Sequence, residues 1–188
     1  GIILATPALR RFRITKRLLR PDRVRLKEIF RLGVPIGLTT IFEVMLFNSA
    51  TLAMGLFGTA SLAAHQIAIT IPSITFMVPL GIGLAATVRV GLAAGAGDRV
   101  ASRRAGFTAM AMATVFMTFS SVLLLSFPRT IAQAWLPGGN AQIIGLAVLF
   151  LPVAAAFQIV DGIQVTAAMA LRGLKDARAP MWIAGASY

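Results

Sequence analysis

Apolar residues are gathered into four long runs, at residues 32–57, 63–94, 105–127 and 142–171, and a fifth run starts at residue 179. A helix needs about 20 mostly apolar residues to cross a bilayer, and each of the four runs is long enough. Backbone groups in lipid must be hydrogen-bonded within the segment, so these runs should be helices. The pattern predicts an all-α integral membrane protein, a polytopic bundle of transmembrane helices.

Composition agrees with this prediction. The chain is 57% hydrophobic and only 13% charged, whereas soluble proteins average about 45–50% apolar and about 25% charged residues. There is no cysteine and only one histidine, which excludes disulfides, thiolate metal sites and multi-histidine clusters. No nucleophile–base pair or metal-ligand set is visible, so we expect no enzyme activity and no cofactor.

The basic residues predict the orientation in the membrane. Ten of them lie in residues 10–31, four from Arg89 to Arg104 and three in residues 172–178. If each run crosses once, these regions share one side, and only Arg129 lies on the other. The positive-inside rule makes the basic side cytoplasmic, so residues 10–31, 95–104 and 172–178 should face the cytoplasm from a cell (inner) membrane.

The net charge of +12 could also indicate nucleic acid. No recognition module accompanies it, so we expect membrane lipid and no nucleic acid as a partner. Residues 10–17 are polybasic and could bind anionic headgroups. The chain thus divides into a basic loop with a lead-in helix at 1–31, capped by Asp22, and a transmembrane part at 32–188. Residues 1–9 could be the tail of a preceding helix, since the chain looks like part of a longer protein.

Prolines interrupt the predicted spans. Pro72 and Pro79 fall in the second, Pro35 in the first and Pro152 in the fourth. A proline inside a helix frees a carbonyl and bends the axis. Transporters use broken helices around sites at the membrane midplane, but proline is also common in transmembrane helices generally. The sequence leaves open whether these bends are functional.

Two carboxylates, Glu43 and Asp161, are isolated in the apolar runs. Glu43 follows Arg31 by 12 residues and Asp161 precedes Arg172 by 11, or about 18 and about 16 Å along a helix. Both distances start from the basic side, so the acids should lie at nearly equal depth near mid-bilayer. An acid within a transmembrane segment predicts an ion or proton site. The alternative is a hydrogen bond that only holds two helices together.

Several polar or aromatic residues could assist this pair. Gln158 is one helical turn before Asp161 and should share its face, and Asn48 lies only roughly on the face of Glu43. Their oxygens, with both carboxylates, would suit a hard cation such as Na⁺. His65, near the outer end of the second span, is expected to make a local hydrogen bond. A proton-relay role is the alternative for His65.

The chain also resembles a known family, the multidrug and toxin extruders (MATE), in their NorM-like branch. The motifs that carry the resemblance occur in family order along most of the chain: Pro35–Gly37, Phe42–Val44, Ala63–Ala68, Pro79–Gly83, Val88–Gly91, Phe157–Gln164 and Ala170–Asp176.

This resemblance implies a fold of twelve helices in two six-helix lobes. The chain would hold the seventh helix to the start of the eleventh, most of the C-terminal lobe, with the missing N-terminal lobe as its partner. The family's cation-site acids fall on Glu43 and Asp161. Many relatives have a tyrosine where this chain has Phe157, which lacks the hydroxyl but could contact a cation through its ring.

We therefore expect a secondary antiporter that exports lipophilic or cationic drugs in exchange for Na⁺ or H⁺. One alternative is a lipid-linked oligosaccharide flippase of the same superfamily. Its cavity should be strongly basic, and Arg89 is the one basic residue we expect to be buried in the spans. The other alternative is a membrane scaffold that transports nothing. The sequence does not decide between Na⁺ and H⁺ or name a substrate.

Overall fold

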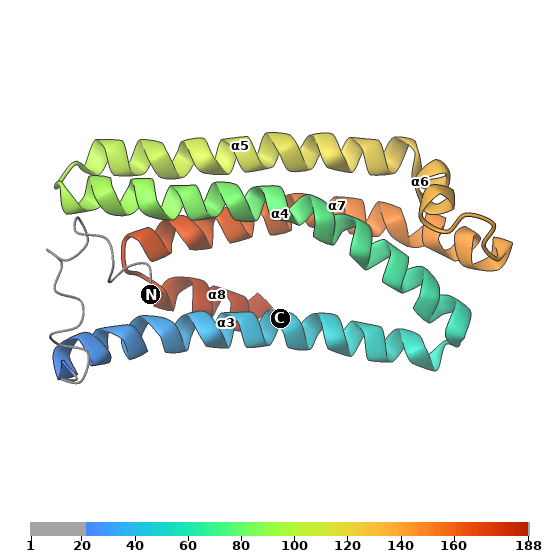
Figure 1. The fold of residues 1–188 in the computed structure, drawn as a ribbon, viewed down its shortest axis with the longest axis horizontal. Helices are drawn as coiled ribbons and strands as arrows, with labels where there is room; N and C mark the ends of the chain where they lie inside the picture. Colours follow the sequence, from blue (N-terminus) through green and yellow to red (C-terminus); the bar gives the residue numbers. More distant parts are fainter. Residues whose placement is uncertain (1–21, 188) are drawn as a thin grey trace, which may run out of the picture.

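The computed structural model describes residues 22–187, which form six helices with no strand among them (Figure 1). The prediction of an all-α membrane bundle is confirmed, since four of these helices are long and apolar enough to cross a membrane. The helices are α3 (Arg23–Leu56), α4 (Thr59–Gly95), α5 (Arg99–Ser126), α6 (Pro128–Trp135), α7 (Ala141–Gly173) and α8 (Arg178–Ser187). The expected tail of a helix at 1–9 and the polybasic stretch at 10–17 lie outside the described residues.

The lead-in helix is the first part of α3, which continues without a break through Pro35. Asp22 caps it, because its carboxylate accepts hydrogen bonds from the backbone N–H groups of Val24 at 3.0 Å and Arg25 at 3.4 Å. These bonds satisfy two of the donors that every helix start leaves free. The short helix α6 was not predicted, because eight residues of mixed polarity make no long apolar run.

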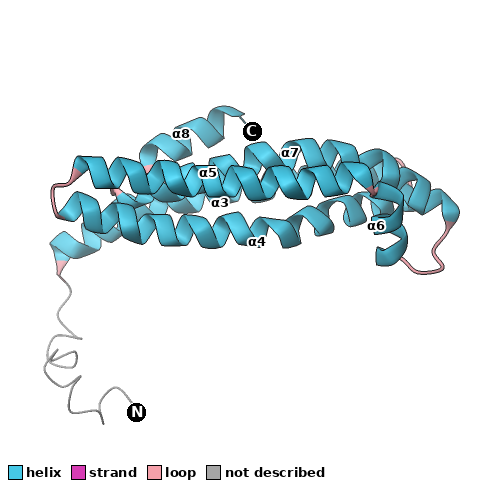
Figure 2. Cartoon of the chain, turned by 90° about the horizontal axis from the view of Figure 1, so that it is seen from above, coloured by secondary structure: helices cyan, strands magenta, loops and turns pink. Residues whose placement is uncertain are grey.

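Three helices, α4, α5 and α7, pack closely against one another, and α3 stands apart from them (Figure 1). The main neighbours of α3 are α8 and, less closely, α4. Figure 2 shows the four long helices running along the same axis, with α6 crossing at one end. We call α4, α5 and α7 the packed trio.

Small residues and hydrogen bonds between helices hold the packed trio together. The hydroxyl of Thr87 on α4 lies 3.0 Å from the carbonyl oxygen of Gly83 on its own helix and 2.7 Å from that of Met169 on α7, and it donates to the nearer one, Met169. A Cβ atom on Gly173 would lie 2.6 Å from the carbonyl oxygen of Thr87, so no larger residue fits there. Elsewhere along α7, Ser121 of α5 donates to the carbonyl of Ala155 at 2.8 Å. Small residues thus let the backbones approach closely, as is common between membrane helices.

Helix α4 bends part-way along its length (Figure 1). Pro72 and Pro79 lie inside it, and each removes a backbone donor and displaces the preceding turn. The first part of α4 therefore runs away from α5 toward the end of α3. The bend leaves room between α3, α4 and α7 at the level where Pro72 lies.

The charged ends of the bundle agree with a single crossing per long helix. The start of α3, the α4–α5 turn and the α7–α8 connection all lie at one end (Figure 1). We call this the basic end, because in the described part of the chain every Lys and Arg except Arg129 belongs to these segments or the helix turns beside them. Arg129 starts α6 at the opposite end.

Candidate intramembrane carboxylate site

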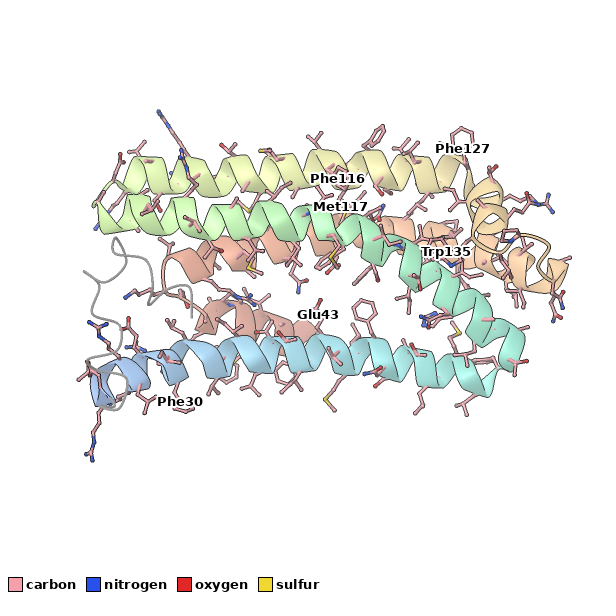
Figure 3. The ribbon with its side chains drawn as sticks, in the orientation of Figure 1. Phe30, Glu43, Phe116, Met117, Phe127 and Trp135 are labelled. Atoms are coloured by element: carbon pink, nitrogen blue, oxygen red, sulfur yellow. The ribbon has the colours of Figure 1, made fainter. Side chains whose placement is uncertain are left out.

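A cavity of about 660 Å³ lies between α3, α4 and α7, and both isolated carboxylates line it. Glu43 comes from α3 and Asp161 from α7, and both side chains are half-buried. Their charges are close enough to interact. Figure 3 shows Glu43 on the side of α3 that faces the other helices. The fold thus brings together two acids that are 118 positions apart in the sequence.

The helical period explains how each wall is built. On α3 the residues that line the cavity are three or four positions apart, from Glu43 through Phe47 and Ala50 to Met54. Such spacing puts side chains on one face of a helix. The same spacing on α7 places Phe157 one turn before Asp161. Most of the wall is apolar. The two carboxylates are the only acidic groups among the lining residues.

Gln158 is the most buried polar group beside the acids, with 2% of its surface exposed. Its Oε1 lies 3.1 Å from the hydroxyl of Thr75, and that hydroxyl also lies 2.9 Å from the carbonyl oxygen of Pro72. A hydroxyl has one proton and cannot donate to both oxygens. Meanwhile Nε2 of Gln158 has no hydrogen-bond partner in the described structure.

Exchanging the oxygen and nitrogen of the Gln158 amide resolves this conflict. The two ends of an amide have nearly the same shape, and the hydrogen-bond network decides between them. In the exchanged orientation Nε2 donates to Thr75, whose proton goes to Pro72. The amide oxygen then takes the buried position that has no hydrogen-bond partner in the described structure. Gln158 would present an acceptor one turn from Asp161.

His65 and Asn48 differ from their predicted roles. His65 lines the same cavity, and its Nε2 has no partner in the described structure, so the expected local hydrogen bond is not found there. The bend in α4 explains this, because it carries the start of that helix over the cavity. Asn48 is exposed and does not line the cavity. Five residues turn a helix by about 140° from its starting direction, so Asn48 faces away from Glu43.

Two aromatic rings face each other at the cavity. Phe47 of α3 and Phe157 of α7 meet edge to face, with ring centroids 6.2 Å apart and planes at 82°. Both rings line the cavity. Edge-to-face contact is a favoured geometry for aromatic pairs. Phe157, where a hydroxyl is absent, therefore contributes an apolar contact across the gap between the two helices.

The basic residue whose charge acts on the acids is Arg172. The expectation that Arg89 is the basic residue buried in the spans is wrong. Arg89 is exposed, whereas Arg172 is half-buried and its charge interacts with that of Glu43. The guanidinium of Arg172 also contacts Sδ of Met169 at 3.5 Å. The sequence held a signal for this: Arg172 follows Asp161 by 11 residues, or about three full turns, so it lies on the same face of α7.

The donor set fits a monovalent cation or protons better than a resident metal. Among the described residues, no three His, Cys, Asp or Glu side chains are grouped closely enough to hold a metal ion. Two carboxylates with the Gln158 oxygen supply hard oxygen donors, which suit ions such as Na⁺. Two carboxylates without a bound ion can also carry protons.

Comparison with known families decides the class of the protein. The MatE family profile matches residues 35–188. The chain belongs to the MatE family. The resemblance drawn from the sequence motifs is thus confirmed, and with the four membrane-length helices it makes this MatE chain a multi-pass membrane protein.

Curated MatE relatives align with the whole chain. A probable multidrug resistance protein NorM from Brucella suis is 45% identical over 190 residues, covering 100% of this chain and 40% of the relative. The Mesorhizobium japonicum protein of the same name is also 45% identical, with 100% and 41% covered. Multidrug resistance protein NorM of Burkholderia vietnamiensis is 44% identical, with 95% and 39% covered. The chain spans about two fifths of the length of these relatives.

A solved structure supports the fold. A MOP superfamily transporter from Pyrococcus furiosus superposes with a TM-score of 0.73, covering 89% of this MatE chain and 36% of that chain. The sequence identity is 20%, so the likeness concerns the fold alone. It shows that the helix arrangement seen here occurs in an experimentally determined transporter.

Proposed function

We propose that the whole protein is a secondary antiporter that exports lipophilic or cationic compounds in exchange for Na⁺ or H⁺. In this proposal Glu43 and Asp161 bind the coupling ion. The observation that carries it is the cavity itself, in which two half-buried carboxylates from different helices share an otherwise apolar wall. The relatives named as multidrug resistance proteins support the substrate class.

The charges of the two acids would couple the movement of the ion to that of the substrate. An ionised carboxylate inside a membrane costs several kcal/mol unless a charge neutralises it. A cationic substrate and a coupling ion can each neutralise this pair, so they compete for it. Entry of Na⁺ or H⁺ from outside would displace the substrate outward. Movement of this lobe against the other would then alternate the access to the cavity.

The residues that line the cavity support a substrate site with aromatic walls and an adaptable shape. Four phenylalanines and three methionines line the cavity: Phe47, Phe76, Phe150, Phe157, Met54, Met77 and Met117. Aromatic faces attract cations, and methionine adapts its shape to many partners. This combination favours lipophilic cations of varied shape over one specific solute.

The cavity weighs against the flippase alternative. Among the described residues that line it, there is no Lys or Arg. An anionic, lipid-linked substrate would need basic groups there. A scaffold without transport would need neither the hollow nor the acids within it.

The proposed orientation has the basic end in the cytoplasm, with the protein in the cell (inner) membrane. The positive-inside rule supports it. The start of α5 carries Arg99 and Arg103, and the α7–α8 connection carries Lys175, at the same end as the basic start of α3. The N-terminal lobe of the whole protein would complete the cavity.

The test is efflux by the full-length protein in proteoliposomes, under a Na⁺ gradient and a pH gradient applied separately. Glu43→Gln and Asp161→Asn should each lower coupled efflux at least about tenfold, because each removes a charge that the ion must neutralise. Asn48→Ala, outside the cavity on α3, is the matched control and should transport normally. Wild-type efflux in both acid variants would overturn the proposal. The gradient that drives wild-type transport identifies the ion.

A further inference from the structure

A second hollow lies at the basic end, among the three helices of the packed trio. Its volume is about 850 Å³, and it shares no lining residue with the carboxylate cavity. It is formed by the end of α4, the start of α5 and the end of α7. The lining residues are Val90, Ala94, Gly97, Arg99, Ser102, Arg103, Gly106, Phe107, Met110, Ala167, Ala170, Leu171 and Leu174. We call this hollow the basic-end groove.

Most of the groove is lined by apolar residues, and two arginines lie at one end of it. Phe107 and Met110 on α5 face Leu171 on α7 across its apolar part. Arg99 and Arg103 lie in the first two turns of α5, four residues apart, so their side chains share one face of the helix. The guanidinium of Arg103 lies over the ring of Phe107, 5.4 Å from its centroid. This contact holds a positive charge at the edge of the apolar part.

No acid of the described chain neutralises these two arginines. The ion pairs among the described residues join Arg25 to Asp22 and Lys175 to Glu28. Asp98, beside Arg99 in sequence, caps α5 by accepting from the N–H of Ala101 at 2.8 Å. Two charges are therefore available for an anion from outside this part of the chain.

The depth of the groove identifies the anion. If α4, α5 and α7 cross the membrane, the α4–α5 turn lies at headgroup level and the apolar part extends toward the hydrocarbon. A free phosphate would use the guanidiniums alone and leave the apolar walls uncovered. An anionic phospholipid satisfies both, and basic pockets between membrane helices on the cytoplasmic side are known to bind such headgroups.

We propose that the basic-end groove binds an anionic phospholipid of the cytoplasmic leaflet. Its phosphate contacts Arg99 and Arg103, and one acyl chain lies along Phe107, Met110 and Leu171. The groove is hollow because small residues line it, among them Gly106 and Ala170. The proposal rests on the proposed orientation, with the basic end in the cytoplasm, but not on the carboxylate site or the coupling ion.

The experiment uses the full-length protein in nanodiscs that contain a photoactivatable phosphatidylglycerol. Crosslinked peptides are identified by mass spectrometry. Labelling is expected within the groove segments of α5 and α7. Arg99→Gln and Arg103→Gln should each reduce it about fivefold, in line with the attraction of one basic residue to an anionic membrane surface. A photoactivatable phosphatidylcholine should label the groove more weakly.

Two further variants separate groove binding from general charge attraction. Ala94→Trp fills the groove from an exposed position while leaving every charge in place, and it should also abolish labelling. Arg104→Gln removes an exposed charge beside the groove that does not line it, and labelling should persist. Each variant is compared at equal monodispersity and melting temperature. Equal loss in Arg104→Gln, or labelling unaffected by Ala94→Trp, would overturn the proposal. So would a groove that another segment of the full-length chain occupies, giving no lipid label.

Discussion

The packed trio and α3 are built in different ways. Within the trio, hydroxyls of Thr87 and Ser121 donate to carbonyls of neighbouring helices, and glycines allow close backbone contact. Gly33 and Gly37 of α3 have nothing within 4 Å of the position a Cβ would take. The carboxylate cavity lies where these two kinds of packing meet. One of its acids is thus fixed in a tightly packed helix, and the other is on a loosely attached one.

The strongest way to break this contrast is Gly173→Leu. Its Cβ would meet the backbone oxygen of Thr87 at 2.6 Å, so α4 and α7 would have to separate, at a cost on the order of 3 kcal/mol or more. Thermal unfolding of the full-length protein in detergent should show a large loss of stability. Gly37→Ala on α3 is the matched control, and should be neutral or stabilise by about 0.5–1 kcal/mol. Equal losses would show that α3 is packed as tightly as the trio.

A smaller effect is expected from Thr87→Val. It keeps the shape of the side chain but leaves the carbonyl of Met169 without the hydroxyl at 2.7 Å. A lost buried hydrogen bond costs about 1–2 kcal/mol. Thr114→Val serves as control, because the Thr114 hydroxyl donates only to Met110 of its own helix. If the two variants melt alike, the bond between helices contributes nothing specific.

Gln158→Leu tests the contribution of the tightly packed helix α7 to ion binding at the cavity. If the amide oxygen of Gln158 is a ligand, its loss should weaken the apparent affinity for the coupling ion about fivefold, equivalent to about 1 kcal/mol. The measurement is the ion dependence of efflux, with melting temperature recorded in parallel. A purely structural role would lower the melting temperature without changing the ion dependence. Thr75→Val should reproduce part of the effect, since Thr75 holds the amide in place.

The smallest effect concerns the one ion pair that joins α3 to the α7–α8 connection among the described residues. Nζ of Lys175 lies 2.6 Å from Oε1 of Glu28, in the basic lead-in before the apolar part of α3. The hydrogen bond and the charge of Lys175 lower the pKa of Glu28 below its usual 4.5. The pair therefore contributes fully above that usual pKa, and its contribution is lost as the pH falls through the lowered value.

Because both side chains are exposed, this attachment should be weak and sensitive to salt. Melting temperatures recorded between neutral and acidic pH should fall slightly more for the wild type than for Glu28→Gln. The difference should vanish in high salt. Parallel curves at all salt concentrations would mean that the pair does not attach α3.

The sequence was sufficient for the four long helices. Run length against bilayer thickness gave the spans, and the fixed rise per residue placed Glu43 and Asp161 at matching distances from the basic side. The direction in which a side chain points around the helix axis is harder to predict from the sequence. The pattern puts Asn48 only roughly on the face of Glu43, and the structure places it outside the cavity lining. The pattern also gives Arg172 no part in the site, although it lies three turns from Asp161 on the same face of α7.

The position of His65 could not be derived from periodicity at all. It depends on how far α4 bends, and two prolines in a span fix neither the angle nor the direction of a bend. The same holds for Gln158, whose partner Thr75 lies on another helix 83 positions away. Contacts of this kind depend on how helices dock, which one sequence does not encode in any local pattern.

The bend in α4 also changes how the polarity of the cavity should be counted. In a regular helix the N–H at position 72 would donate to the carbonyl of Ala68, but Pro72 has no N–H to give. Ala68 and Pro72 both line the cavity. The carbonyl of Ala68, a lining residue, therefore lacks its helical N–H donor, and backbone carbonyls freed in this way coordinate ions in transporters. A count of polar side chains alone would therefore underestimate the number of polar groups at the cavity.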